Sequence, residues 1–427
     1  MNQAYQRTTG NWGREQEWLN LWVLMILPIL VLFPRTTGWI SVPLMLCGIY
    51  VAAKYKTLLS IDRFFLAICL ILPISILFNM PFMGWEIGEL GRPSHLIAGF
   101  FIFVVIGRYG LRPNVLFWAA CLAAMIAFGI ALYEVVYLGN ERVFGLARRW
   151  NAVPFGNFSL LIAFFCLAGV FVIPKDNRHS WWRIVIGLLG FLCGFGASLM
   201  SGTRGGWIAL PILLLLCMYF SNRLTPRLRN IFIVAILVVI VGGGTISDRV
   251  SSRVELAINQ VHAYVLHPKD LSVQDNAVAI RLAMWQWGIE RFLEHPLTGI
   301  GFAEYEDRRK QAVRENELPK EFGRLANLHN ELISRLAMGG LPAALAVLVF
   351  WFLGWRFFVT KIDNENSNDQ SYYALCGLVT IVGTCLFSMT EALFGTSSGT
   401  KAIMLLLVIP AGALRYVYVN QQERKSL

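Results

Sequence analysis

The stretch 115-VLFWAACLAAMIAFGIALYEVV-136 has a single charged residue, Glu134, among its 22 positions. At about 1.5 Å per residue, a helix of this length crosses the hydrocarbon core of a bilayer, which is roughly 30 Å thick. The stretch therefore predicts a transmembrane helix.

Apolar runs of this kind recur along the whole chain. Its 427 residues are 56% hydrophobic and 15% charged, with a mean hydropathy of +0.57. These values exclude an ordinary soluble domain and predict an all-α polytopic membrane protein. We expect twelve spans, at about 18–33, 39–53, 64–78, 95–106, 115–136, 158–172, 182–200, 207–220, 231–241, 332–352, 372–386 and 403–416.

The distribution of Lys and Arg over the short loops predicts the orientation. With the N-terminus in the cytoplasm, the inner segments carry 18 of these residues and the outer loops carry 7. Because cytoplasmic loops are enriched in Lys and Arg, both termini are expected in the cytoplasm. The first apolar run ends at Pro34 and Arg35 without a small-residue cleavage site, so it reads as a retained span.

One connection is much longer than the others and divides the chain. We expect residues 1–247 to form spans one to nine, 248–328 a long outer loop, and 329–427 spans ten to twelve with a cytoplasmic tail. Within the loop, 277–293 has apolar residues at helical spacing, which predicts an amphipathic helix on the membrane surface or over the bundle. The charged stretch 303–316 predicts a second, solvated helix.

Arginines on the outer side are the first candidates for chemistry. Arg204 lies in the tight turn 201-SGTRGGW-207, where small residues let a ligand approach and a guanidinium can bind phosphate in a bidentate way. Arg281 lies one turn before Trp285. Further outer arginines, which the positive-inside rule does not explain, are Arg92, Arg142, Arg148 and Arg149. The alternative is that these arginines only snorkel to the membrane surface.

His329, in 328-LHNEL-332, is the candidate base. The positive end of the helix that follows disfavours the imidazolium form, and a neutral imidazole can accept a proton. The alternative is a histidine that bonds to a neighbouring backbone group, with Asn327 or Asn330 capping the helix. The six histidines and eight cysteines show no metal-ligand spacing, and the cysteines all lie in apolar runs. We expect no metal, no cofactor and no nucleic-acid partner.

These features together resemble the O-antigen ligase family. The resemblance is carried by the long outer loop, the turn around Arg204, the stretch from Arg281 and Trp285 to 296-PLTGIG-301, and His329-Asn330 running into Gly339-Gly340. It covers nearly the whole chain in topology, and it implies a fold like that of GT-C glycosyltransferases.

The resemblance also implies an activity. Such enzymes move O-antigen from undecaprenyl pyrophosphate to the lipid A core at the periplasmic face of the bacterial inner membrane, during lipopolysaccharide biosynthesis. It implies that Arg204 and Arg281 hold the pyrophosphate and that His329 deprotonates the acceptor hydroxyl in an inverting, metal-independent transfer. Membrane lipids are the remaining expected partners. Arg92, Arg142, Arg148, Arg149, Asn330 and Trp285 are candidates for further substrate contacts.

Two alternatives stay open from the sequence. An O-antigen polymerase uses the same donor with a second lipid-linked glycan, and a polysaccharide flippase or transporter is also a basic protein with many spans. Transport would predict broken helices near the middle of the bilayer and pseudo-repeats between the halves. Glu134 and Glu391, at the outer rim, are carboxylates that could pair with the arginines.

Overall fold

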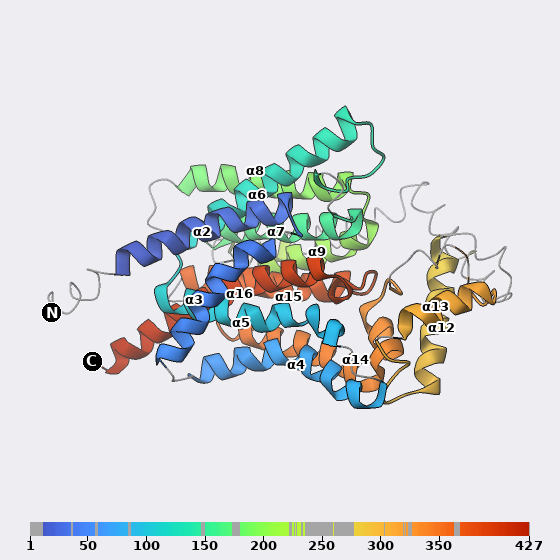
Figure 1. The fold of residues 1–427 in the computed structure, drawn as a ribbon. Helices are drawn as coiled ribbons and strands as arrows, with labels where there is room; N and C mark the ends of the chain where they lie inside the picture. Colours follow the sequence, from blue (N-terminus) through green and yellow to red (C-terminus); the bar gives the residue numbers. More distant parts are fainter. Residues whose placement is uncertain are drawn as a thin grey trace.

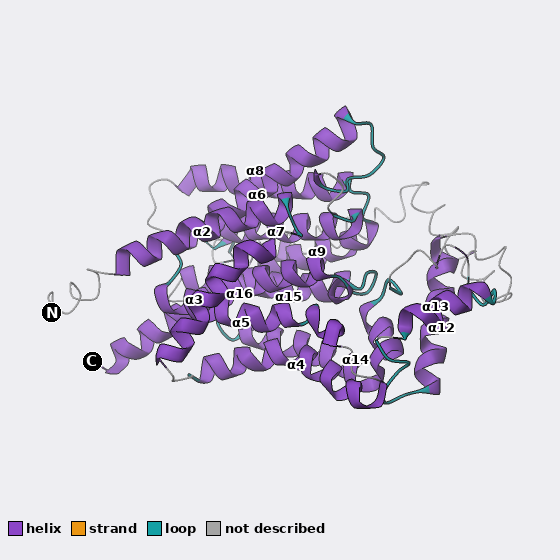
Figure 2. Ribbon diagram, in the orientation of Figure 1, coloured by secondary structure: helices purple, strands orange, loops and turns teal. Residues whose placement is uncertain are grey.

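The computed structural model is built from helices joined by short connections (Figure 2). It describes residues 12–35, 37–55, 59–83, 87–146, 150–172, 180–221, 224–225, 227, 229–231, 234, 259, 277–302, 304–318, 320, 322, 327–362 and 368–426. Every regular element within these ranges is helical, which confirms the predicted fold class.

Ten of the described helices are long and apolar enough to cross a membrane. The helices before the long loop are α2 (Trp12–Leu32), α3 (Thr37–Tyr55), α4 (Ser60–Met83), α5 (Ser94–Tyr109), α6 (Pro113–Leu132), α7 (Ala152–Phe171), α8 (Ser180–Met200) and α9 (Arg204–Tyr219). After it come α14 (Glu331–Val359), α15 (Asn368–Phe387) and α16 (Ser397–Ser426). Short turns of helix are η1 (Ile87–Gly91), η2 (Tyr133–Tyr137) and η5 (Leu393–Gly395).

Ten of the twelve expected spans coincide with these long helices. The eighth corresponds to α9, whose apolar part, Gly205–Tyr219, is shorter than the others. The ninth, expected at 231–241, falls almost entirely outside the described residues.

Helix α7 lies at the centre of the bundle. Of its spanning window, 94% is buried inside the protein, because α6, α8, α9 and α15 all pack against it. Its sequence is apolar on every side, as expected for a helix without a solvent or lipid face. Asn157 and Ser159 are the buried polar residues on it, near the end of the bundle where the chain turns into α9.

The long loop contributes two helices beyond one end of the bundle, α12 (Ala277–Glu294) and α13 (Tyr305–Arg314). Figure 1 shows them at the end opposite to both chain termini. Both helices were predicted from the sequence. The buried side of α12 is carried by Ala279, Ala283, Met284 and Trp287, whereas Ile289, expected on the apolar face, is 42% exposed. The physical reason is that α12 packs against α14 and against the rest of its own loop, and the face of α12 toward these two partners is the one that is buried.

Helix α14 is broken at Gly340, whose φ of 64° and ψ of −161° are not helical. The chain leaving α12 lies backbone to backbone against this break: Ile300 N donates to Ala337 O at 2.8 Å, and Leu341 N donates to Pro296 O at 2.8 Å. A side chain at Gly340 would collide with the backbone of Leu297. The 19 residues after the break span about 28 Å by themselves. Residues 331–339, before the break, are therefore not needed to cross the membrane.

Candidate functional site

His329 lies in the short segment that leads from the outer loop into α14. Its φ is +50°, a left-handed conformation that side chains other than glycine seldom adopt. Its N–H donates to Asn327 Oδ1 at 3.0 Å, and Asn330 Oδ1 caps the helix by accepting from Ile333 N at 3.1 Å. Observed backbone strain of this kind is often found at functional sites.

Glu391 fixes the orientation of the His329 ring. Its Oε2 lies 2.9 Å from His329 Nδ1, and its Oε1 accepts from Asn327 Nδ2 at 3.3 Å. An ionised carboxylate can only accept, so Nδ1 donates, and the lone pair is assigned to Nε2. The carboxylate is 6% exposed and the imidazole 20% exposed. The buried group therefore orients the ring, while the ring itself keeps access to a substrate.

The segment that carries Glu391 is joined directly to the start of α14. Glu331 N donates to Ser388 O at 2.9 Å, and Asn330 Nδ2 donates to Met389 O at 3.3 Å. Sequence reasoning expected Asn330 to cap the helix or contact substrate. The structure gives its side chain the cap and a bond across to the Glu391 segment, which leaves it buried at 7% exposure.

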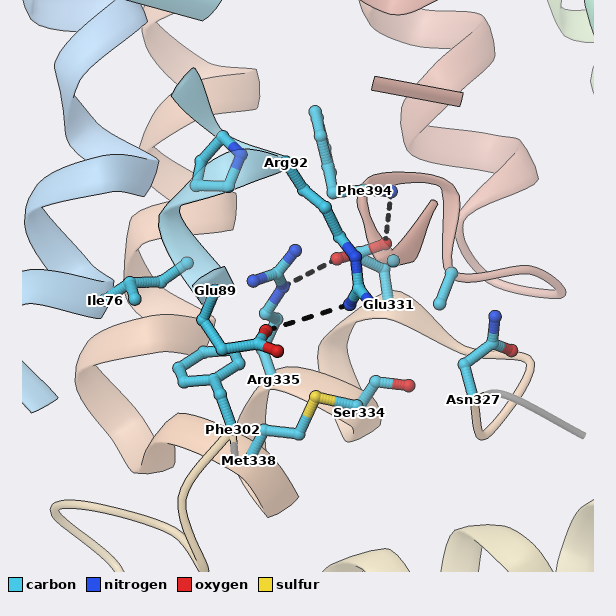
Figure 3. A pocket seen from close by; sticks show the side chains of 13 residues that line it. Ile76, Glu89, Arg92, Phe302, Asn327, Glu331, Ser334, Arg335, Met338 and Phe394 are labelled. Carbon is cyan, nitrogen blue, oxygen red and sulfur yellow. Dashed lines mark hydrogen bonds and ion pairs between the residues drawn. The ribbon is translucent and has the colours of Figure 1, made fainter. Parts of the chain in front are cut away.

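A pocket lies between α4, η1, α14 and η5, and its lining includes Asn327, which bonds to His329 and Glu391 (Figure 3). Glu331 lines this pocket: its Oε1 accepts from Arg335 Nε at 2.7 Å, and its Oε2 accepts from Phe394 N at 3.0 Å. The guanidinium of Arg335 lies over the ring of Phe302, 5.6 Å from its centre. Arg92 reaches into the same pocket from the opposite wall, 3.8 Å from Glu89. The cavity measures about 30 Å³, so it admits water but not a sugar.

Arg204 is the first residue of α9, and its side chain lies outside what the structure describes. The next residue, Gly205, packs closely on Thr390, because a side chain at Gly205 would collide with the hydroxyl of Thr390. This contact fixes the position of the Arg204 backbone. Thr390 precedes Glu391, so the start of α9 packs directly against the segment that holds His329. Arg142, from the loop after α6, lies against the turn that precedes α9, where its Nε donates to Ser201 O at 3.0 Å.

Arg281 and Trp285 approach the site from the loop helix α12. Trp285 Nε1 donates to Leu328 O at 2.9 Å, so the indole holds the residue immediately before His329. Arg281 is exposed one helical turn earlier, on the side of α12 that carries Trp285. The structure therefore brings Arg92, Arg142, Arg281, Trp285, His329 and Asn330, with the backbone of Arg204, to one end of the bundle. Arg148 and Arg149 lie outside the described residues.

From the sequence, the two carboxylates Glu134 and Glu391 could pair with arginines. Glu391 instead bonds to His329 and Asn327, because its segment is tied to the start of α14. Glu134, 4% exposed, accepts from Phe144 N at 2.7 Å through Oε2 and so holds the outer loop after α6.

Sequence reasoning missed the pair of Glu331 and Arg335. The available signal was an acid and a base four residues apart at the start of an apolar run, where neither charge is expected without a partner. The described residues contain no group of three or more His, Cys, Asp or Glu side chains that could hold a metal ion.

Residues 189–348 match the family model described as O-antigen ligase. The chain is also 20% identical over 315 residues to an uncharacterized protein of Haemophilus influenzae, covering 73% of this chain and 76% of that protein. The matched segment includes Arg204, Arg281, Trp285 and His329, and it ends before Glu391.

Proposed function

We propose that this chain, whose residues 189–348 match the family model described as O-antigen ligase, is a membrane glycosyltransferase that joins a lipid-linked glycan to a second lipid. The donor in this proposal is O-antigen on undecaprenyl pyrophosphate, and the acceptor is the lipid A core. The reaction takes place at the periplasmic face of the bacterial inner membrane, with both chain termini in the cytoplasm. Figure 1 shows α12 and α13 at the end opposite to both termini, which agrees with the loop and the termini lying on opposite sides of the membrane.

The observation that carries the proposal is the bond between His329 Nδ1 and Glu391 Oε2 at 2.9 Å. It presents Nε2 as the proton acceptor. The acceptor hydroxyl gives its proton to Nε2 while its oxygen forms a bond to the anomeric carbon. The bond from that carbon to the pyrophosphate breaks, and its electron pair leaves with the pyrophosphate. Attack opposite the leaving group inverts the anomeric centre.

Arginines supply the charge that stabilises the departing pyrophosphate. In the proposal, Arg204 and Arg281 bind its oxygens, and Arg92 and Arg142 add positive charge to the same end of the bundle. Fixed cations aimed at a developing negative charge can do the work that a divalent metal does in other transferases. Trp285 and Asn330 act on His329 through the backbone that they hold.

The test is transfer by the purified protein in detergent. Lipid-linked O-antigen is supplied with either the lipid A core or a second lipid-linked glycan, with and without excess chelator. We expect product with the lipid A core, unaffected by chelator and abolished in His329→Ala. Product formed only with the second lipid-linked glycan would show a polymerase, and loss of activity on chelation would contradict the metal-free scheme.

A transport assay in vesicles separates the remaining alternative. The break in α14 at Gly340 is of the kind that transporters use, but the 19 residues that follow it suffice to cross the bilayer, so it lies near the outer surface. We expect no movement of lipid-linked glycan across vesicles. Movement without transfer would overturn the enzymatic proposal.

A further inference from the structure

A second and larger cavity opens between α3, α5 and α16, next to the pocket between α4, η1, α14 and η5. It measures about 530 Å³, within the usual range of small-ligand sites. Its residues come from the outer ends of these three helices. None of them was singled out as a site residue by the sequence.

Two cations stand at the mouth of this groove. Arg35 is exposed, and the Lys401 ammonium donates to the carbonyl of Arg35 at 3.5 Å. Within the described part of the chain, no carboxylate lies within ion-pair distance of either side chain. Both lie on the predicted outer side, where topology gives no reason for positive charge. The mouth is therefore suited to an anionic group.

The walls below the mouth are apolar. Trp39, Val42 and Met45 line the α3 side, with Phe101 and Met404 opposite. Trp39 is 81% exposed, as expected of an indole at the boundary between membrane and water. A cationic rim over an apolar wall fits a lipid whose phosphate lies at the surface and whose hydrocarbon chain enters the groove.

The groove shares a wall with the pocket between α4, η1, α14 and η5. Ser94 and His95 line the groove, and the two residues before them, Arg92 and Pro93, line the pocket. His95 Nε2 lies 2.9 Å from the hydroxyl of Ser397, which closes the wall between α5 and α16. The start of α9, with the backbone of Arg204, packs against Thr390, which precedes Glu391 and does not line the groove. The groove and the proposed pyrophosphate site are therefore formed by different residues.

We propose that this groove holds the acceptor lipid, with a phosphate of the lipid between Arg35 and Lys401 and an acyl chain along α3. The inference rests on the proposed function, because it assigns the second substrate of that reaction. It follows from the lining: none of the described residues of the groove is a proposed pyrophosphate contact, so the groove is left for the second lipid of the reaction, whose phosphate and acyl chain match its cationic mouth and apolar walls.

The test uses a double variant that carries both Arg35→Gln and Lys401→Gln. The control is Lys310→Gln, at a residue that pairs with Glu306 on α13. Glutamine at 401 keeps a donor for the Arg35 carbonyl while removing the charge. We expect the Kd for the lipid A core, measured without donor, and the acceptor KM to rise about fivefold per charge, so about 25-fold in the double variant. In the double variant, the kcat and the donor KM stay at wild-type values. The control variant Lys310→Gln keeps wild-type values of the Kd, both KM values and the kcat.

A second pair of variants tests the apolar wall. Ala98→Trp fills the groove, and Leu46→Trp places the same side chain on the exposed face of α3 outside it. We expect only Ala98→Trp to weaken acceptor binding. For an acceptor without its phosphates, we expect the Kd to be the same in the wild type and in the double variant of Arg35 and Lys401.

The outcomes separate the two proposals. Wild-type acceptor affinity in every groove variant, or a rise in the donor KM instead, overturns the groove as the acceptor site while transfer stands. Equal loss of phosphatidylglycerol binding also overturns it, because the groove would then hold bulk anionic lipid. Absence of transfer by the wild-type protein overturns the proposed function, and the binding measurement still reports on the groove.

Discussion

The substitution Glu391→Gln tests whether the carboxylate sets the tautomer of His329. Glutamine keeps the shape of the side chain but replaces one acceptor oxygen with a donor. In the native site, Glu391 accepts from both His329 Nδ1 and Asn327 Nδ2, and Asn327 Oδ1 in turn accepts from His329 N. An amide at 391 cannot accept at both positions.

The magnitude follows from the two orientations of the new amide. With its oxygen on Asn327 Nδ2, its NH₂ faces His329 Nδ1, which favours the tautomer with the proton on Nε2 and removes the base. With its oxygen on Nδ1, two NH₂ groups face each other in a buried site. That mismatch costs about 1–3 kcal/mol. Because only this orientation keeps the active tautomer, its cost lowers kcat by about 5-fold to 150-fold.

The assay is single-turnover transfer with saturating donor and acceptor lipids. We expect the kcat of Glu391→Gln to fall within that range, with the donor KM unchanged, and Glu304→Gln, an exposed carboxylate on the loop, to behave as wild type. The double variant with His329→Ala should be no slower than His329→Ala alone, because both act on one step. A wild-type kcat in Glu391→Gln would refute this account of the base.

Three other predictions concern binding and stability. Arg204→Ala and Arg281→Ala should each lower turnover by about 10²-fold to 10³-fold, measured with the same assay, because each removes one contact to the leaving group. Gly340→Ala should destabilise the fold by about 1–3 kcal/mol or more, seen in thermal unfolding in detergent, because its backbone conformation is nearly exclusive to glycine. Arg335→Ala should cost about 3–5 kcal/mol in the same measurement, because Glu331, 1% exposed, would keep a buried charge without its partner.

Residue type and position mark Arg204, Arg281 and His329 as candidates, because charged or titratable groups on the predicted outer side of a membrane protein have few structural reasons to be there. Their roles are implied by the family resemblance and stay predictions. Glu391 was noticed for the same reason, but its partner was not, since 62 positions separate it from His329. Arg335 was missed because its partner, Glu331, lies four residues away on a helix, a spacing that also occurs on ordinary solvated surfaces.

The sequence by itself determined the class of the fold, because the length and polarity of each apolar run must match the bilayer. It also determined the two loop helices, through periodicity that each segment carries alone. Only the tertiary structure decided which side chains meet. The bond between His329 and Glu391, the packing of Gly205 on Thr390 and the groove between Arg35 and Lys401 each join segments far apart in the chain. Such contacts depend on how whole helices pack, and that free energy is shared among many residues rather than encoded in one stretch.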